Sequence, residues 1–238
     1  MNPFIVTGAT GGLGEKVTQD FAKKKIDVVV VAKDEKKLAR LCDVYPNVCF
    51  SVCADMSKTE DIENIFKLAS EKQIKFSGLI HCAGVNYSFP ISVADMDSFM
   101  SMMAVNAASF MEMGKYFLKK KYSDEGAYLI AISSMAAVSM PAGMANYSAS
   151  KEALNVIVKT MAKESVKRRH CVNAIMPGYL EEQMNSEKVF LNDEQKLQIQ
   201  PFGTIPHEQV IHLIEFLISG KANYITGSII PIGGGQIQ

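Results

Sequence analysis

The sequence lacks an excess of charge of either sign. Its 25 lysines and arginines balance 25 aspartates and glutamates, so the formal net charge is zero and the isoelectric point is about 6.9. Such a chain has no bulk attraction for nucleic acid or for an anionic membrane, and we expect neither as a partner. There are two short basic clusters, residues 119–121 and 167–169, and each follows a predicted helix. Their positive charges complement the negative end of the helix dipole.

Long hydrophobic runs are missing too. No apolar run approaches the roughly 18 residues that indicate a membrane-spanning helix. No early segment joins a charged start to an apolar stretch, as a signal peptide does. We therefore expect a cytoplasmic protein.

Cysteine and histidine motifs are absent as well. The five cysteines show neither a Cys-x-x-Cys spacing nor a Cys/His pattern, so we expect no metal and cysteines that are reduced and mostly buried. They are Cys42, Cys49, Cys53, Cys82 and Cys171. Of the four scattered histidines, His81 precedes a turn and is interpreted as a packed neighbour rather than a catalyst.

What the sequence does contain is a regular alternation of strand and helix patterns. Hydrophobic residues make up 48% of the chain, and no linker interrupts it, so residues 1–238 should form a single domain. Seven short apolar runs predict strands: residues 4–6, 28–31, 48–52, 79–82, 127–132, 172–176 and 229–232. Their alternation with helices predicts an α/β fold, a Rossmann-type doubly wound parallel sheet with helices on both faces.

Three helix ends can be placed from the sequence. Ser57 and Glu60 have the spacing of a capping box, and Ser92 is expected to begin a helix that carries Met96. Gly220 should end the last long helix.

A glycine-rich turn follows the first predicted strand. Gly8, Gly12 and Gly14 have the spacing Gly-x-x-x-Gly-x-Gly, and a helical pattern begins at Leu13. Unpaired N–H groups at a helix start form an anion site, and glycine lets a pyrophosphate approach the backbone closely. The turn therefore predicts dinucleotide binding, although a turn that only needs flexibility has the same composition.

Ser134, Tyr147 and Lys151 can together build a proton donor for a carbonyl. Tyr147 and Lys151 are one helical turn apart and so share a helix face, and a nearby ammonium should lower the pKa of the phenol. The chain has a second Tyr-x-x-x-Lys pair, Tyr116 and Lys120, but the residue thirteen positions before Tyr116 is a methionine without a hydroxyl.

These features together resemble the short-chain dehydrogenase/reductase family over nearly the whole chain, most closely its 3-oxoacyl-(acyl-carrier-protein) reductase branch. The resemblance implies that Tyr147 donates the proton, Ser134 holds the carbonyl oxygen, Lys151 fixes the nicotinamide ribose, and Asn106 supports a water-linked proton path. It also implies the cofactor-binding residues, which would be Thr7, Gly8, Thr10, Gly11, Gly12, Leu13, Gly14, Lys33, Asp55, Met56, Cys82, Ala83, Gly84, Tyr147, Lys151, Pro177 and Gly178.

The end of the second strand bears on the choice of cofactor. NAD users of the family place an acid where this chain has Ala32, and Lys33 follows, which favours NADP(H) over NAD(H). Two features oppose this: Gly11 stands where many NADP-dependent relatives carry a basic residue, and Asp34 is close enough to compete.

Two departures from the family pattern remain. Gly8, Gly11 and Gly14 also fit the turn of the extended branch, but only residues 179–238 follow Pro177-Gly178, which favours the short form. Glu182 stands where the family often has a threonine that meets the cofactor carboxamide.

The substrate is a keto compound that the sequence does not identify. Residues 135–144 and 181–206 should determine specificity, and Met135, Met140 and Met144 form an adaptable pocket or fill the core. An acidic carrier protein would need a basic rim, for which the two basic clusters are the only candidates. The alternatives are a reductase or dehydrogenase of another small ketone or alcohol, in a secondary or polysaccharide pathway, and a non-catalytic regulator that senses dinucleotides.

The resemblance also implies a homotetramer. The predicted helix that follows Tyr147 is apolar around more than one face, and so is the methionine-rich helix at residues 100–117. A helix that covers a sheet needs one apolar face, so the surplus should be buried between subunits or within one subunit.

Overall fold

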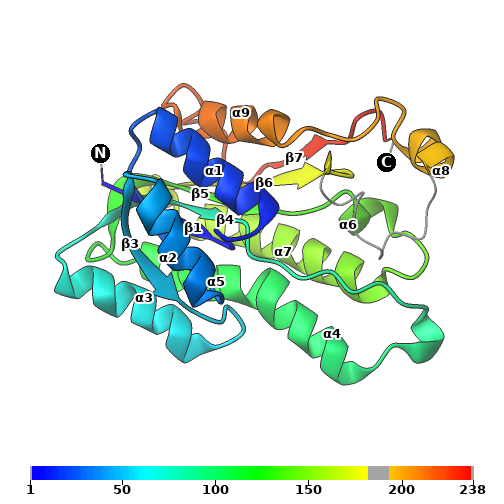
Figure 1. Ribbon diagram of the computed structural model, residues 1–238, viewed down its shortest axis with the longest axis horizontal. Helices are drawn as coiled ribbons and strands as arrows, with labels where there is room; N and C mark the ends of the chain where they lie inside the picture. The colour runs from blue at the N-terminus through cyan, green and yellow to red at the C-terminus, as the bar shows by residue number, and fades with distance from the viewer. Residues whose placement is uncertain (1, 182–192, 237–238) are drawn as a thin grey trace.

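The computed structural model describes residues 2–181 and 193–236 and contains one parallel sheet (Figure 1). The sheet has seven strands in the order β3-β2-β1-β4-β5-β6-β7, and every neighbouring pair is parallel. The strands are β1 (Phe4–Thr7), β2 (Val28–Ala32), β3 (Val48–Cys53), β4 (Phe76–His81), β5 (Ser123–Ile132), β6 (Cys171–Pro177) and β7 (Ile229–Ile232). The predicted α/β fold and all seven predicted strands are confirmed.

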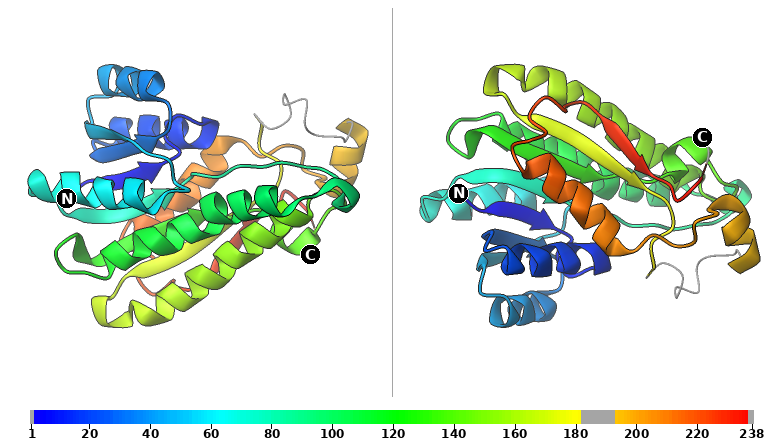
Figure 2. Two further views of the ribbon diagram at one scale, coloured as in Figure 1. Left: turned by 90° about the horizontal axis from the view of Figure 1, so that it is seen from below. Right: turned by 90° about the horizontal axis from the view of Figure 1, so that it is seen from above.

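Helices cover both faces of the sheet (Figure 2). One face packs against α1 (Gly12–Lys23), α2 (Glu35–Val44) and α9 (His207–Ile218), and the other against α3 (Thr59–Glu71), α5 (Ser109–Phe117) and α7 (Ala145–Glu164). The other helical elements described are α4 (Met96–Met103), the π-helical turn Ala104–Ala108 that joins α4 to α5, α6 (Ala136–Ser139), α8 (Asp193–Ile199), and the 3-10 turns Ile91–Val93 and Val166–Arg168.

The strands are continuous apolar runs because both of their faces are covered. In β2, Val29 and Val31 point into the cluster beneath α3 and α5, whereas Val28 and Val30 point into the cluster beneath α1 and α9. All five residues of β2 are buried. This two-sided burial holds the carboxyl ends of the strands at one rigid edge.

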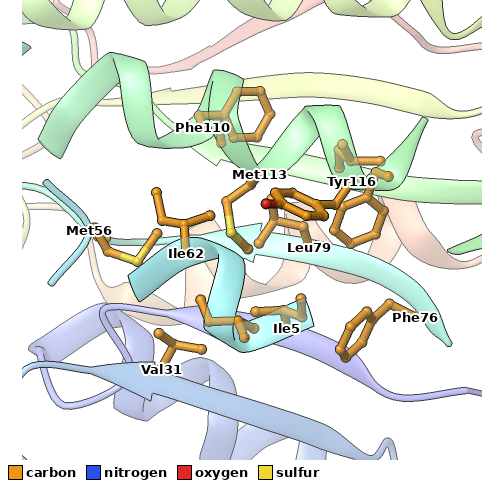
Figure 3. Close-up of a cluster of buried hydrophobic side chains, with 14 of the residues drawn as sticks. Ile5, Val31, Met56, Ile62, Phe76, Leu79, Phe110, Met113 and Tyr116 are labelled. Atoms are coloured by element: carbon orange, nitrogen blue, oxygen red, sulfur yellow. The ribbon is translucent and has the colours of Figure 1, made fainter. Parts of the chain in front are cut away.

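Tyr116 is on α5, and its side chain lies in the core against α3 (Figure 3). Its ring stacks on Phe66 with the centroids 4.2 Å apart and the planes within 5°. The second Tyr-x-x-x-Lys pair therefore contributes its tyrosine to packing.

Two predicted helix starts are wrong. α3 begins at Thr59 with Lys58 as its N-cap, and Ser57 instead donates from its backbone N–H and its hydroxyl to Asp55 Oδ1. α4 begins at Met96, because Asp95 Oδ1 accepts the N–H of Ser98, and a separate 3-10 turn contains Ser92. In the first place the carboxylate of Asp55 engages Ser57 itself, and in the second Asp95 replaces Ser92 as the capping residue. The last helix was placed correctly: α9 ends at Ile218, and Gly220 has a φ of +79°.

The expectation of mostly buried cysteines is also wrong. All five are free thiols, but Cys42, Cys49 and Cys53 are exposed. Cys49 and Cys53 lie on β3, which is an edge strand, so that no further strand shields them. Cys171 is buried and Cys82 is partly buried.

None of the helices in the described part of the chain has the length and apolar character that crossing a bilayer requires.

Candidate active site

The glycine turn packs closely against the loop after β4. Gly8 has a φ of +63°, and a Cβ there would lie 2.8 Å from the backbone nitrogen of Ala83. A Cβ on Gly14 would collide with the carbonyl oxygen of Gly8. Both positions therefore require glycine, since neither neighbour is a flexible side chain.

The N-terminus of α1 opens onto this turn. Its N-cap, Gly11, is extended and has no side chain to cap the N–H groups of the first turn. Gly12, Leu13 and Gly14 begin the helix, and Thr10 precedes the N-cap residue Gly11. Bare N–H groups and the positive end of a 12-residue helix fit the pyrophosphate of a dinucleotide, as the sequence predicts.

His81, at the end of β4, connects the glycine turn to the π-helical turn. The imidazole Nδ1 lies 2.9 Å from Thr7 Oγ1, and Nε2 lies 3.0 Å from Ser109 Oγ. Thr7 Oγ1 also accepts the N–H of Ala83 at 3.2 Å, and Ser109 donates its hydroxyl proton to the carbonyl of Val105 at 2.7 Å. These bonds tie together the ends of β1 and β4 and the start of α5.

The bonds also determine the protonation of His81. Ser109 uses its proton on a carbonyl, so its oxygen accepts from Nε2–H, and Nδ1 accepts the proton of Thr7. His81 is thus neutral, and burial, with the charge of Lys151, lowers its pKa to about 3. The reading of His81 as a packed neighbour of the turn agrees with this role.

Ser134, Tyr147 and Lys151 come together beyond the carboxyl end of β5. Ser134 follows this strand by two residues, and Tyr147 and Lys151 lie on α7. The Lys151 ammonium donates to the carbonyl of Ile132 at 2.8 Å and lies 5.8 Å from the centre of the Tyr147 ring. Tyr147 and Lys151 are 8% and 4% exposed, so any charge that forms there is poorly hydrated.

The expected lowering of the Tyr147 pKa is not found. Burial raises the pKa of Tyr147 above its usual value, and a hydrogen bond with Ser134 opposes this rise. Burial also lowers the pKa of Lys151 to about 8, against the opposing influence of Cys82. Burial of both side chains, which the sequence does not show, outweighs the attraction between ammonium and phenolate.

Asn106 lies in the π-helical turn with its side chain fully engaged. Its Oδ1 accepts the N–H of Val85 at 2.8 Å, and Nδ2 donates to the carbonyl of Val85 and to Ser150 Oγ, both at 2.9 Å. Ser150 in turn donates to the carbonyl of Tyr147 at 2.7 Å. Asn106 therefore connects the loop after β4 to the helix that carries Tyr147. π-Helical turns often occur at functional sites, and here the turn brings Asn106 into this position.

The loop after β4 passes beside Lys151. A Cβ on Gly84 would lie 3.3 Å from both Lys151 Nζ and Asn106 Oδ1, so this glycine leaves open the space beside the ammonium. Cys82 and Ala83 precede it, and burial raises the pKa of Cys82 to about 12, which keeps the thiol protonated.

Lys33 and Asp55 form an ion pair at the ends of β2 and β3. Lys33 Nζ lies 3.0 Å from Asp55 Oδ2, and the lysine side chain is 60% exposed. Burial alone would raise the pKa of Asp55, but hydrogen bonds from Ser57 and the pair with Lys33 lower it to about 2. Asp34 Oδ1 caps α2 by accepting the N–H of Lys37. This hydrogen bond engages the carboxylate that could otherwise bind the ribose of NAD(H). Met56, the next residue after Asp55, is buried.

Pro177 and Gly178 leave the carboxyl end of β6 next to Ser134. The carbonyl of Pro177 accepts the N–H of Met135 at 2.8 Å. Gln200 packs against Gly178 and Tyr179. Its Oε1 accepts the N–H of Tyr179 at 2.8 Å, and a Cβ on Gly178 would collide with the same oxygen. Glu182, which replaces the usual threonine, lies outside the described residues.

Three polar residues of this site, Ser109, Ser150 and Gln200, and the backbone of Val85 were missed in the sequence. Ser109 and Ser150 are fully or almost fully buried on otherwise apolar helix faces, a signal that the periodicity could have given. Gln200 stands in a polar segment and has no comparable signal.

Comparison with known proteins identifies the family. A family profile described as short chain dehydrogenase matches residues 3–190. The chain belongs to this family. It is 31% identical to the 3-oxoacyl-(acyl-carrier-protein) reductase FabG of Rickettsia conorii over 241 residues, which cover 98% of this chain and 96% of the relative. Carbonyl reductase family member 4 of Xenopus laevis is 27% identical over 232 residues, with 97% and 95% covered.

Solved structures of the family share the fold. A short-chain dehydrogenase/reductase of Serratia marcescens matches 99% of this chain and 98% of its own with a TM-score of 0.88, at 23% sequence identity. A short chain dehydrogenase of Bacillus anthracis matches 99% and 96% with a TM-score of 0.86, at 24% identity. The family profile and the curated relatives confirm the predicted family and its oxidoreductase class.

Proposed function

We propose that this protein is an NADP(H)-dependent carbonyl reductase that converts a keto group to a secondary alcohol. The observation that carries the proposal is the convergence of Ser134, Tyr147 and Lys151 beside the glycine turn, at the carboxyl edge of the sheet. Ligands of open α/β sheets bind at this edge. The curated relatives support two substrate classes, 3-oxoacyl groups on carrier protein and other carbonyl compounds.

The bound reduced nicotinamide would supply the hydride. Tyr147 keeps its proton at neutral pH, because burial raises its pKa, and so can donate it to the carbonyl oxygen as negative charge develops there. Ser134 would hold the same oxygen by a hydrogen bond. The buried Lys151 ammonium would stabilise the phenolate that remains, and Asn106 would keep α7 and the loop after β4 in register.

The test of this proposal is oxidation of NADPH with a panel of simple ketones and 3-keto thioesters, repeated with NADH. Turnover of at least one ketone, with transfer of the nicotinamide hydride to product, supports it. Tight dinucleotide binding without turnover of any ketone would favour the regulator instead.

We further propose that Lys33 selects NADP(H). It lies at the end of β2, where Ala32 brings no carboxylate, and its exposed ammonium can reach a 2′-phosphate. Lys33→Ala should weaken NADPH binding by about 1–2 kcal/mol, or about 5–30-fold in Kd, and NADH binding by less. Lys23→Ala, an exposed change at the far end of α1, is the control. Equal losses for both cofactors, or a wild-type preference for NADH, would contradict the assignment.

We also propose a homotetramer with two-fold interfaces. Met100 on α4, Met111 on α5 and Val156 on α7 are 57%, 49% and 55% exposed, so the apolar surplus of these helices is not buried within the subunit. Light scattering should return about four times the chain mass of 26.1 kDa. A monomer at micromolar concentration would contradict this assembly.

A further inference from the structure

The segments that carry the catalytic residues are poor in positive charge. Residues 84–114 and 133–150 include Asn106, Ser134 and Tyr147 and contain no lysine or arginine. The first segment has three carboxylates and the second has no charged residue. Across residues 178–206 the sequence has five carboxylates against two lysines. The first two segments therefore present only neutral or negative groups, and the buried Lys151 follows the second.

Part of this negative charge lies against the helix that carries Tyr147. Asp95 caps α4, and hydrogen bonds from Ser98 lower its pKa, so the carboxylate is ionised at neutral pH. Ser98 Oγ lies 3.5 Å from the amide nitrogen of Asn146, the residue before Tyr147. Asp97 is exposed in the first turn of the same helix.

The two basic clusters lie at the opposite edge of the sheet (Figure 1). Residues 119–121 follow α5, and residues 167–169 precede β6; the two are joined where His170 Nε2 lies 2.9 Å from the carbonyl of Phe117. Arg168 donates to the carbonyl of Ser123, which begins β5. Ser134 follows the other end of this ten-residue strand, about 30 Å away at roughly 3.3 Å per residue. The two basic clusters are therefore too far from Ser134 to form the basic rim that an acidic carrier protein would need.

Besides Ser134 and Lys151, apolar side chains pack on Tyr147. Met102 and Ala136 are buried against it, and Val85 and Met144 pack on the same cluster. The N–H of Phe89 donates to the carbonyl of Gly143 at 2.9 Å and so holds the two segments of this wall together. Thioether, methyl and isopropyl groups can pack on an apolar substrate but cannot neutralise an anion.

We infer that the substrate is a free, uncharged ketone with an apolar group beside the carbonyl, and not a keto group carried on an acidic protein or on a phosphate-bearing arm. The inference rests on the proposed reductase function. An acidic carrier would meet like charge at Asp95 and Asp97, which disfavours that complex, and a phosphate would find no lysine or arginine in residues 84–114 or 133–150.

The experiment compares one 3-ketoacyl group in three forms, with NADPH as reductant. These are the uncharged N-acetylcysteamine thioester, the coenzyme A thioester and the acyl-carrier-protein thioester. We expect kcat/KM to fall in that order, with the carrier form about tenfold or more below the uncharged form at low salt. The rate with the carrier form should rise as salt screens the repulsion, whereas an attractive complex would lose rate.

A charge reversal makes the test specific. Asp97→Lys should raise the ratio of kcat/KM for the carrier form to that for the uncharged form, and Glu71→Lys, at the end of α3, should not change it. Two outcomes would overturn the inference but leave the reductase function intact. One is a wild-type preference for the carrier form that weakens with salt. The other is an unchanged ratio in Asp97→Lys. If none of the three thioesters and no simple ketone is reduced, with NADPH or with NADH, both the inference and the proposed reductase function would be overturned.

Discussion

Replacement of Tyr147 by phenylalanine is expected to lower kcat for ketone reduction by about 10²–10⁴-fold, because the hydroxyl that would donate the proton is lost. The Kd for NADPH should change little, since the ring stays packed against Met102 and Ala136. Steady-state reduction of the best ketone, together with a fluorescence titration of NADPH, measures both quantities.

Tyr116→Phe is the matched control. It removes the same hydroxyl from the other Tyr-x-x-x-Lys pair, whose ring stacks on Phe66 in the core. Its turnover should stay within a factor of about two of the wild type, because a core ring keeps its packing without the hydroxyl. If Tyr116→Phe were inactive and Tyr147→Phe active, the assignment of the proton donor would be wrong.

The strands were predictable because each is a short apolar run that is buried on both faces. β2 shows this most simply, since four consecutive valines serve both layers. Helix starts were less predictable. The choice between Ser57 and Lys58, or between Ser92 and Asp95, depends on which backbone N–H groups a nearby carboxylate reaches after the chain has turned.

The candidate site was predictable as a set of residues but not in its electrostatics. Tyr147 and Lys151 share a helix face whether they are buried or exposed. The pKa of the phenol, however, depends on how much water remains around it. The position of the basic clusters, by contrast, could have been predicted. A helix that follows a strand starts at the carboxyl edge and ends at the amino edge, so cations at helix ends lie far from the active site.

The bonds of His81 depend on tertiary structure. Ser109 is 28 positions away from His81 and Thr7 is 74 positions away, and no local pattern pairs them. A sequence argument could only weigh a packed histidine against a catalytic one. In the folded chain the imidazole accepts a hydrogen bond from Thr7 and donates one to Ser109, and this defines one neutral tautomer.

This arrangement makes His81 a strong contributor to stability. His81→Leu should lower the free energy of unfolding by about 2–4 kcal/mol, because the Thr7 hydroxyl loses its acceptor inside the core and leucine fills the imidazole volume imperfectly. Urea unfolding measures the loss, with the exposed His212→Leu as a control that should change stability by about 0.5 kcal/mol or less.

The contribution of His81 should also depend on pH. The folded state holds the pKa at about 3, against 6.5 for an ordinary histidine, so between these values the unfolded chain binds a proton that the folded chain does not. Stability from this residue is therefore complete above pH 6.5 and declines by about 1.4 kcal/mol per pH unit as the pH falls toward 3. His81→Leu lacks this loss, so its deficit relative to the wild type should shrink as urea midpoints are measured from pH 7.5 down to 4.5. A deficit that stays constant over this range would show that His81 is not held neutral by its partners.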